Sequence, residues 1–286
     1  MENDLSIYTA KEFGEARGIL IKRLVGDLEV SAVDKPHAEL LGGQSGAGKT
    51  KLHHLIKNEH NKNAIVINGD EYRSRHPHYR ELDAKYGVDA VSYTATWAGK
   101  MTEALIDALS VMQYNLVIEG TLRMSAVPLK TATLLKRRGY SVSLALMAVK
   151  PEISLISCQI RYEQMRIAGT IPRATDPAHH NKIIYDIVSN LDVLEKSEMF
   201  DDIRLFSRTG ACLFSRKGES AAGTDEPASG ASGHDGGSAA AHAEQSVDEG
   251  SASEALRAIL FGEWTTEEKM HYEFLQKHLS DLKKKQ

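Results

Sequence analysis

The segment Gly43–Thr50 constrains the fold of this chain more than any other part of its sequence. It reads GQSGAGKT and matches the phosphate-loop pattern G-x-x-x-x-G-K-[ST] without a mismatch. Its glycines let the backbone turn so that amide N–H groups face a phosphate, and the N-terminus of a following helix adds positive partial charge. An apolar run before the segment and a helical pattern after it predict the strand–loop–helix unit that the motif needs.

The loop is expected to hold a nucleoside triphosphate. Its residues are Gly43, Gln44, Ser45, Gly46, Ala47, Gly48, Lys49 and Thr50. We expect Lys49 to reach the β- and γ-phosphates of ATP and the Thr50 hydroxyl to ligate Mg²⁺. The motif does not identify an acceptor, because phosphate loops occur in kinases, GTPase switches and ATP-driven machines.

Residues 1–217 alternate short apolar runs with helical patterns, and we interpret them as one P-loop kinase domain. The predicted strands are Ala38–Leu41, Ala64–Ile67, Asn115–Ile118, Ser141–Val149 and Ile203–Phe206. The predicted helices are Lys49–Glu59, Thr94–Gln113, Val127–Arg138, Pro151–Arg166 and one opened by Asp176-Pro177. Continuously apolar strands are typical of a sheet covered on both faces. We therefore predict an α/β fold with a mostly parallel sheet flanked by helices.

The stretch 218–253 differs in composition from the rest of the chain. It contains seven Asp or Glu, no Lys or Arg, and mostly Gly, Ala and Ser. Such a segment buries too little apolar surface to offset its ordering entropy, so we predict a disordered acidic linker. Residues 254–286 then form a C-terminal helical segment, with helices predicted at Ala255–Leu260 and Thr265–Leu282.

Charge and cysteine content exclude several classes of function. A net charge of −4 argues against a generally basic nucleic-acid-binding protein, and two cysteines exclude a four-cysteine zinc site. The acidic start Met1–Asp4 does not suit a signal peptide, and the longest apolar run is too short to span a bilayer. We therefore expect a cytoplasmic protein with neither nucleic acid nor membrane as a partner.

Acidic residues follow two of the predicted strands, at the edge where the phosphate loop is expected. Asp70 follows Ala64–Ile67, where it could accept the proton of an attacking hydroxyl or instead cap a helix. Glu119 ends the apolar run Asn115–Ile118, where it could hold Mg²⁺ through water or position a substrate.

Four further residues are candidates near the same edge. Thr121 and Arg123 come directly after Glu119, and Arg123 could equally be an ordinary surface arginine. Arg161 lies in a predicted helix and Arg173 in the turn after it. These two arginines could neutralise charge on a transferring phosphoryl group or simply lie on a solvated helix face.

Taken together, these residues resemble the zeta toxin family, the kinase halves of bacterial toxin–antitoxin systems. The matching stretches are Leu41–Thr50, Asn68–Tyr72 with His76-Pro77, Met101–Ala104, Tyr114–Arg123, Val127-Pro128 with Thr131–Thr133, Ile160–Glu163 and Arg173–Thr175. The order and spacing of these stretches carry the resemblance more than the phosphate loop alone does.

The resemblance implies an ATP- and Mg²⁺-dependent kinase that phosphorylates the 3′-hydroxyl of the amino sugar in UDP-N-acetylglucosamine and so blocks the use of a cell-wall precursor. It implies that Asp70 is the catalytic base and that Lys49, Arg161 and Arg173 act on the ATP phosphates. The residues that it implies for the UDP-sugar are Asp70, Glu103, Glu119, Thr121 and Arg123. It also implies a small helical antitoxin, made as a separate chain, that blocks the nucleotide site.

Two alternatives remain at this stage. The same scaffold serves kinases of other small molecules, such as a nucleoside, an antibiotic or another sugar nucleotide. A nucleotide-dependent switch or binding module would share the phosphate loop, although no N-K-x-D element for guanine selectivity occurs in the sequence.

Overall fold

The structure is a computed structural model, and it describes residues 4–26, 30–170, 175–217 and 250–285. The predicted linker 218–253 lies outside the described residues except for positions 250–253, and Arg173 also lies outside them.

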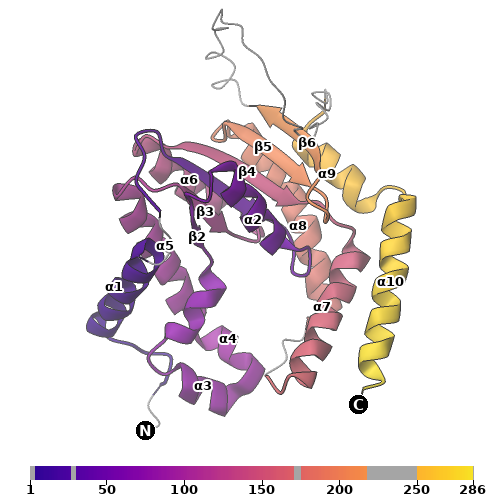
Figure 1. Ribbon diagram of the computed structural model, residues 1–286, viewed down its shortest axis with the longest axis horizontal. Helices are drawn as coiled ribbons and strands as arrows, with labels where there is room; N and C mark the ends of the chain where they lie inside the picture. The colour runs from indigo at the N-terminus through magenta and orange to yellow at the C-terminus, as the bar shows by residue number, and fades with distance from the viewer. Residues whose placement is uncertain (1–3, 27–29, 171–174, 218–249, 286) are drawn as a thin grey trace, which may run out of the picture.

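In the described part of the chain, six strands form one sheet in the order β2-β3-β1-β4-β5-β6 (Figure 1). The strands are β1 (His37–Gly42), β2 (Ile65–Ile67), β3 (Leu116–Glu119), β4 (Ser141–Met147), β5 (Asp202–Phe206) and β6 (Cys212–Lys217). Strands β1 to β5 pair in parallel, which confirms the predicted sheet, and β6 pairs antiparallel with β5. The sequence did not predict β6, because only Phe214 of its side chains is buried and the long apolar run of a central strand is missing.

The predicted helices are all present in the described part of the chain, and three further α-helices and two 3₁₀ helices are additional. Their bounds are α1 (Ala10–Gly26), α2 (Lys49–Glu59), α3 (Tyr79–Tyr86), α4 (Ala90–Tyr93), α5 (Ala95–Val111), α6 (Ala126–Arg137), α7 (Pro151–Ile167), α8 (Pro177–Lys196), α9 (Ala252–Phe261) and α10 (Thr266–Lys283), with 3₁₀ helices η1 (Gly69–Arg75) and η2 (Gly87–Asp89). The short helices α3 and α4 follow η1 and fill a stretch for which the sequence predicted no element.

Helices cover both faces of the sheet, as expected for continuously apolar parallel strands. Successive side chains of a strand point to opposite faces. In β1, Leu40 accordingly packs in a core cluster with α1, α5, α6, α8 and α9, whereas Leu41 packs in a second cluster with α2, α7 and α10.

The strand register brings three predicted loops to one edge of the sheet. Leu41 at the end of β1 lies opposite Glu119 at the end of β3, and β2 pairs with β3 through Ile67 and Ile118. Because parallel strands all end at the same edge, the phosphate loop, the turn that carries Asp70 and the end of β3 are neighbours.

The C-terminal helices pack onto the main body. Helix α10 runs along α7 (Figure 1) and contributes buried leucines to the same cluster. Both C-terminal helices begin with a capping box, Ser251 with Glu254 in α9 and Thr265 with Glu268 in α10. The cap at Ser251 explains why α9 begins at Ala252 rather than at the predicted Ala255.

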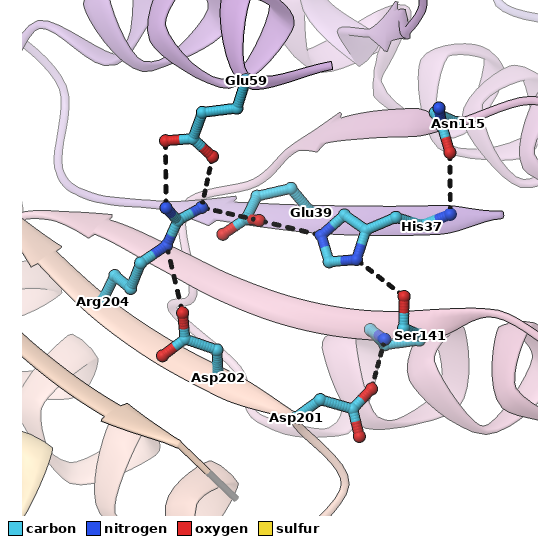
Figure 2. Close-up of polar contacts among 9 residues, drawn as sticks. His37, Glu39, Glu59, Asn115, Ser141, Asp201, Asp202 and Arg204 are labelled. Carbon is cyan, nitrogen blue, oxygen red and sulfur yellow. Dashed lines mark hydrogen bonds and ion pairs between the residues drawn. The ribbon is translucent and has the colours of Figure 1, made fainter. Parts of the chain in front are cut away.

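A partly buried charge cluster surrounds Arg204 of β5 and Glu39 of β1 (Figure 2). Glu39 of β1 is only 1% exposed, and its Oε2 accepts from Arg204 Nη2 at 3.1 Å and lies 3.1 Å from His37 Nε2. Arg204 also donates to both carboxylate oxygens of Glu59 at 3.0 Å and lies 3.4 Å from Asp202 Oδ2. Burial opposes the charge of Arg204, but the Glu39 and Glu59 carboxylates raise its pKa. The cluster therefore ties β1, β5 and the end of α2 together through one guanidinium.

None of the helices in the described ranges combines the length and the apolar character that crossing a membrane would need.

Candidate active site

The phosphate loop connects β1 to α2 and takes a conformation that glycine permits. Gly43, Gly46 and Gly48 have φ values of 132°, 79° and 95°, which L side chains rarely adopt. A Cβ atom on Gly46 would collide with the Ser154 carbonyl oxygen, so α7 passes directly against the loop. The helix that follows begins at Lys49, and its N-terminus faces the loop as the motif predicts.

Side chains from distant parts of the chain fix the loop. Gln44 is buried, and its Nε2 donates to the Val149 carbonyl at 2.8 Å and to Ser154 Oγ at 3.2 Å. Arg208, in the turn between β5 and β6, donates through Nη1 to the Gly46 carbonyl at 2.8 Å. Hydrogen bonds to a charged donor are among the stronger ones, so the bond from Arg208 helps to hold the loop in its shape.

Lys49 lies at the centre of the site. Its Nζ donates to the carbonyls of Gly43 at 2.9 Å and Gln44 at 3.3 Å, and its side chain is only 11% exposed. Burial lowers the pKa of Lys49, and the nearby carboxylates of Glu119 and Asp70 act in the opposite direction. A phosphate group bound in the loop would meet an ammonium group that has been withdrawn from water.

Glu119 stands between two basic side chains. Its Oε1 lies 3.9 Å from Lys49 Nζ, and its Oε2 lies 2.8 Å from His53 Nε2. The imidazole is not aligned as a hydrogen-bond donor, so this is a close contact between the two groups and not a hydrogen bond. His53 follows Lys49 by four residues and therefore lies on the same face of α2.

Asp70 lies in η1, directly after β2, and its side chain is 60% exposed. The Asn68 side chain accepts from the Asp70 N–H at 3.1 Å, so Asn68 caps this 3₁₀ helix and Asp70 does not. One carboxylate oxygen of Asp70, Oδ1, accepts from Arg73 Nε at 2.9 Å. The exposed aspartate is thereby held on the edge that also carries the phosphate loop.

Arg161 reaches the phosphate loop from α7. Its Nη2 donates to Ser45 Oγ at 3.0 Å, and Cys158, one turn earlier on α7, donates to the same hydroxyl at 3.4 Å. The guanidinium of Arg161 is close enough to Lys49 to lower the pKa of that lysine. Two positive charges therefore meet at the loop.

The other predicted residues are spread around this centre. Thr50 is exposed in the first turn of α2, and Thr121 and Arg123 are exposed in the loop that follows β3. Glu103 of α5 pairs at 2.9 Å with Lys130 of α6, and both side chains are largely exposed.

Three residues of the site were not singled out in the sequence. His53 and Arg73 could have been found from helical spacing, four residues after Lys49 and three after Asp70. Arg208 had no local signal, because its contact with Gly46 spans more than 150 positions of the chain.

The sheet order and the phosphate loop define a P-loop protein with a kinase-like fold. The model of the zeta toxin family matches residues 22–219, and the chain belongs to that family.

Relatives agree with this assignment. The chain is 39% identical over 283 residues to toxin PezT of Streptococcus pneumoniae serotype 4, covering 99% of this chain and 100% of the relative. It is 39% identical over 209 residues to toxin zeta of Streptococcus pyogenes, covering 73% of this chain and 72% of the relative. A solved structure from the PezAT chromosomal toxin–antitoxin system of S. pneumoniae matches with a TM-score of 0.80 at 37% identity, covering 99% of this chain and 100% of that chain.

Proposed function

We propose that this protein is the toxin of a toxin–antitoxin pair and that it transfers the γ-phosphoryl group of ATP to the 3′-hydroxyl of the amino sugar in UDP-N-acetylglucosamine. The observation that carries the proposal is that one edge of the sheet brings together the phosphate loop with Lys49, the Arg161 guanidinium, which donates to Ser45 Oγ at 3.0 Å, and the turn that carries the Asp70 carboxylate. Phosphoryl transfer needs positive charge at the phosphates and a proton acceptor at the attacking hydroxyl. Membership of the zeta toxin family supports the choice of acceptor.

In the proposed step the sugar hydroxyl oxygen attacks the γ-phosphorus of ATP. The bond from this phosphorus to the oxygen that bridges it to the β-phosphorus breaks, and ADP leaves with that electron pair. Asp70 accepts the proton of the hydroxyl. Lys49 and Arg161 stabilise negative charge on the transferring group, and we propose the same for Arg173.

The site offers oxygen donors that suit Mg²⁺. The Thr50 hydroxyl is exposed at the first turn of α2, and the Glu119 carboxylate lies at the end of β3. Mg²⁺ takes oxygen ligands and keeps several of its waters, so direct ligation by Thr50 and a water-mediated contact with Glu119 fit its chemistry. When bound, Mg²⁺ neutralises charge on the β- and γ-phosphate oxygens.

We assign the UDP-sugar to the side of the site beyond Asp70 and Glu119. Glu103, Thr121 and Arg123 are proposed to bind it. The exposure of Thr121 and Arg123 directly after β3 supports this assignment, because a ligand there remains accessible from solvent.

We further propose that a small helical antitoxin, made as a separate chain, covers the nucleotide site. The relative from S. pneumoniae belongs to a toxin–antitoxin system. A cytoplasmic location fits the two free thiols, Cys158 and Cys212.

The test is an acceptor panel. The protein is incubated with Mg-ATP and a series of UDP-sugars, nucleosides and aminoglycosides, and mass spectrometry follows the products. We expect a phosphorylated form of UDP-N-acetylglucosamine. If only another acceptor is phosphorylated, UDP-N-acetylglucosamine is not the substrate and that acceptor takes its place. If the protein retains nucleotide and phosphorylates no acceptor, a switch or binding module is favoured.

A further inference from the structure

We propose that Arg73 is a positioning residue that orients the Asp70 carboxylate for proton transfer. The inference rests on the proposed kinase function, because it concerns the group that accepts the proton from the hydroxyl. Arg73 Nε donates to Asp70 Oδ1 at 2.9 Å, and Arg73 is 17% exposed whereas Asp70 is 60% exposed.

The local backbone brings these two side chains together. In a 3₁₀ helix there are three residues per turn, so side chains at positions i and i+3 lie directly above one another. Asp70 and Arg73 occupy such positions in η1. At seven residues η1 is longer than most 3₁₀ segments. Tertiary contacts hold it, including the bond from Trp97 Nε1 to the Tyr72 carbonyl at 3.0 Å.

The other end of the Arg73 guanidinium is attached to a different part of the fold. Its Nη1 donates to the Val91 carbonyl in α4 at 2.8 Å and to Thr94 Oγ1 at 3.4 Å. Thr94 is fully buried at the junction of α4 and α5, where its hydroxyl also donates to the Ala90 carbonyl at 3.0 Å. Arg73 therefore connects an exposed carboxylate to a buried, well-packed helix junction.

The guanidinium group suits this role better than an ammonium group would. Its planar arrangement of N–H donors lets Nε bind the carboxylate while Nη1 binds the helix junction. An exposed aspartate without such a partner would sample several rotamers, and each would place its oxygens differently relative to the acceptor. Positioning of a reacting group contributes to the rate because small misplacements are costly.

The assignment also distinguishes the two oxygens of Asp70. Arg73 engages Oδ1, so the proton of the sugar hydroxyl is assigned to Oδ2 as the oxygen–phosphorus bond forms and ADP leaves. Arg73 touches neither the hydroxyl nor the phosphate in this scheme, and it acts only through Asp70.

The test compares Arg73→Met, Arg73→Lys and the matched control Arg75→Met, which removes an exposed arginine from the same 3₁₀ helix. For Arg73→Met we expect kcat of sugar phosphorylation to fall by about 10- to 100-fold with little change in KM for ATP. Arg73→Lys keeps a cation beside Asp70 and is expected to recover part of the rate. Arg75→Met is expected to behave like the wild type.

Two further readouts separate positioning from a structural role. Because Arg73 acts through Asp70, Arg73→Met should cost little additional rate in an Asp70→Asn background, measured as single-turnover product formation. Urea unfolding of each variant shows whether the fold is retained.

The outcomes are distinguishable from failure of the proposed function. If the wild type phosphorylates no UDP-sugar, the proposed function falls. If the wild type is active and Arg73→Met matches it, or if its loss of rate is equally large in the Asp70→Asn background, the positioning role of Arg73 is wrong.

Discussion

Lys49 Nζ lies 3.9 Å from Glu119 Oε1, and both side chains are largely buried at the ends of their elements. The pairing follows from the strand register, because Leu41 of β1, which precedes the phosphate loop, lies opposite Glu119 of β3. Burial lowers the pKa of Lys49 and the Glu119 carboxylate opposes that effect, so the acid helps to keep the ammonium charged beside the phosphate loop. The site therefore keeps the Lys49 ammonium group charged at the place where a phosphate in the loop would lie.

Replacing Lys49 should weaken nucleotide binding selectively. A charged hydrogen bond contributes enough that Lys49→Met is expected to weaken ATP affinity by about 10- to 100-fold. Isothermal titration calorimetry with a non-hydrolysable ATP analogue measures this, and Lys51→Met, an exposed lysine two residues later on α2, is the matched control. Unchanged affinity in Lys49→Met would show that the loop holds the phosphates without it.

Replacing Asp70 should separate chemistry from binding. Asp70→Asn preserves the shape of the side chain but removes the proton acceptor, so transfer should slow by about 100-fold or more. ATP affinity should remain within about twofold, because Asp70 is assigned to the hydroxyl and not to the phosphates. Glu71→Gln changes the adjacent exposed acid of η1 and should leave turnover unaltered. Near-normal turnover in Asp70→Asn would remove Asp70 from the mechanism.

Arg161 should act on the transition state more than on bound ATP. Its guanidinium contacts Ser45 of the phosphate loop from α7. Loss of one preorganised donor to developing charge typically costs on the order of 100-fold in kcat, which we expect for Arg161→Met. Arg257→Met, an exposed arginine of α9, serves as the control. A change confined to KM for ATP would instead assign Arg161 to ground-state binding.

The charge cluster of Figure 2 should govern stability and not catalysis. Arg204→Met would leave the Glu39 carboxylate buried without its cation and should lower the free energy of unfolding by about 3 kcal/mol, the lower end for a broken buried pair. The double variant Glu39→Leu and Arg204→Met should recover part of the loss, because it removes the stranded charge. Urea unfolding measures both, and equal stability of Arg204→Met and wild type would contradict this account of the cluster.

Acid should destabilise the fold through two histidines, the buried His76 and the half-buried His60. Burial lowers the pKa of His76 below its ordinary 6.5, and burial together with His37 lowers that of His60. At a pH just below 6.5, these imidazoles are therefore still mostly neutral in the folded protein, whereas they already bind protons in the unfolded chain. The stability they contribute is complete above pH 6.5 and is lost as pH falls through the lowered pKa values.

We therefore expect the free energy of unfolding to fall between about pH 7 and about pH 5. His76 packs edge-on against Trp97 and Tyr8, so His76→Asn will also change stability at neutral pH. The decisive quantity is the slope of unfolding free energy with pH, which His76→Asn should make shallower. An identical slope in the variant would exclude His76 as a contributor.

Much of the fold could be predicted from the sequence because its signals are local. Helix α2 has the predicted bounds Lys49–Glu59, and the apolar strands and glycine-rich loop lie within a few residues of their predicted positions. The segment from η1 to α4 could not be predicted, because its short helices depend on tertiary contacts such as that of Arg73 with the Val91 carbonyl. The linker over residues 218–249 and the contacts of Arg173 remain predictions, since these residues lie outside the described ranges, whereas the last predicted linker residues, Ala252 and Ser253, belong to α9.

The candidate site divides in the same way. Residues that the motif itself specifies, such as Gly43, Gly48 and Lys49, lie in the predicted loop, and their contacts with ATP remain predictions. Glu103 had no local pattern to distinguish it, and only the family resemblance pointed to it. Arg208 was missed for a physical reason, because its role depends on β5 ending beside the phosphate loop in three dimensions.

The most direct test of the central claim is the structure of the reaction product. The product of the protein with Mg-ATP and UDP-N-acetylglucosamine is purified, and phosphorus–proton correlation NMR locates the new phosphate. The account predicts a phosphate coupled to the proton at position 3 of the amino sugar, with one ADP formed for each product molecule. A phosphate at another position, or ADP released without a phosphorylated sugar, would contradict it.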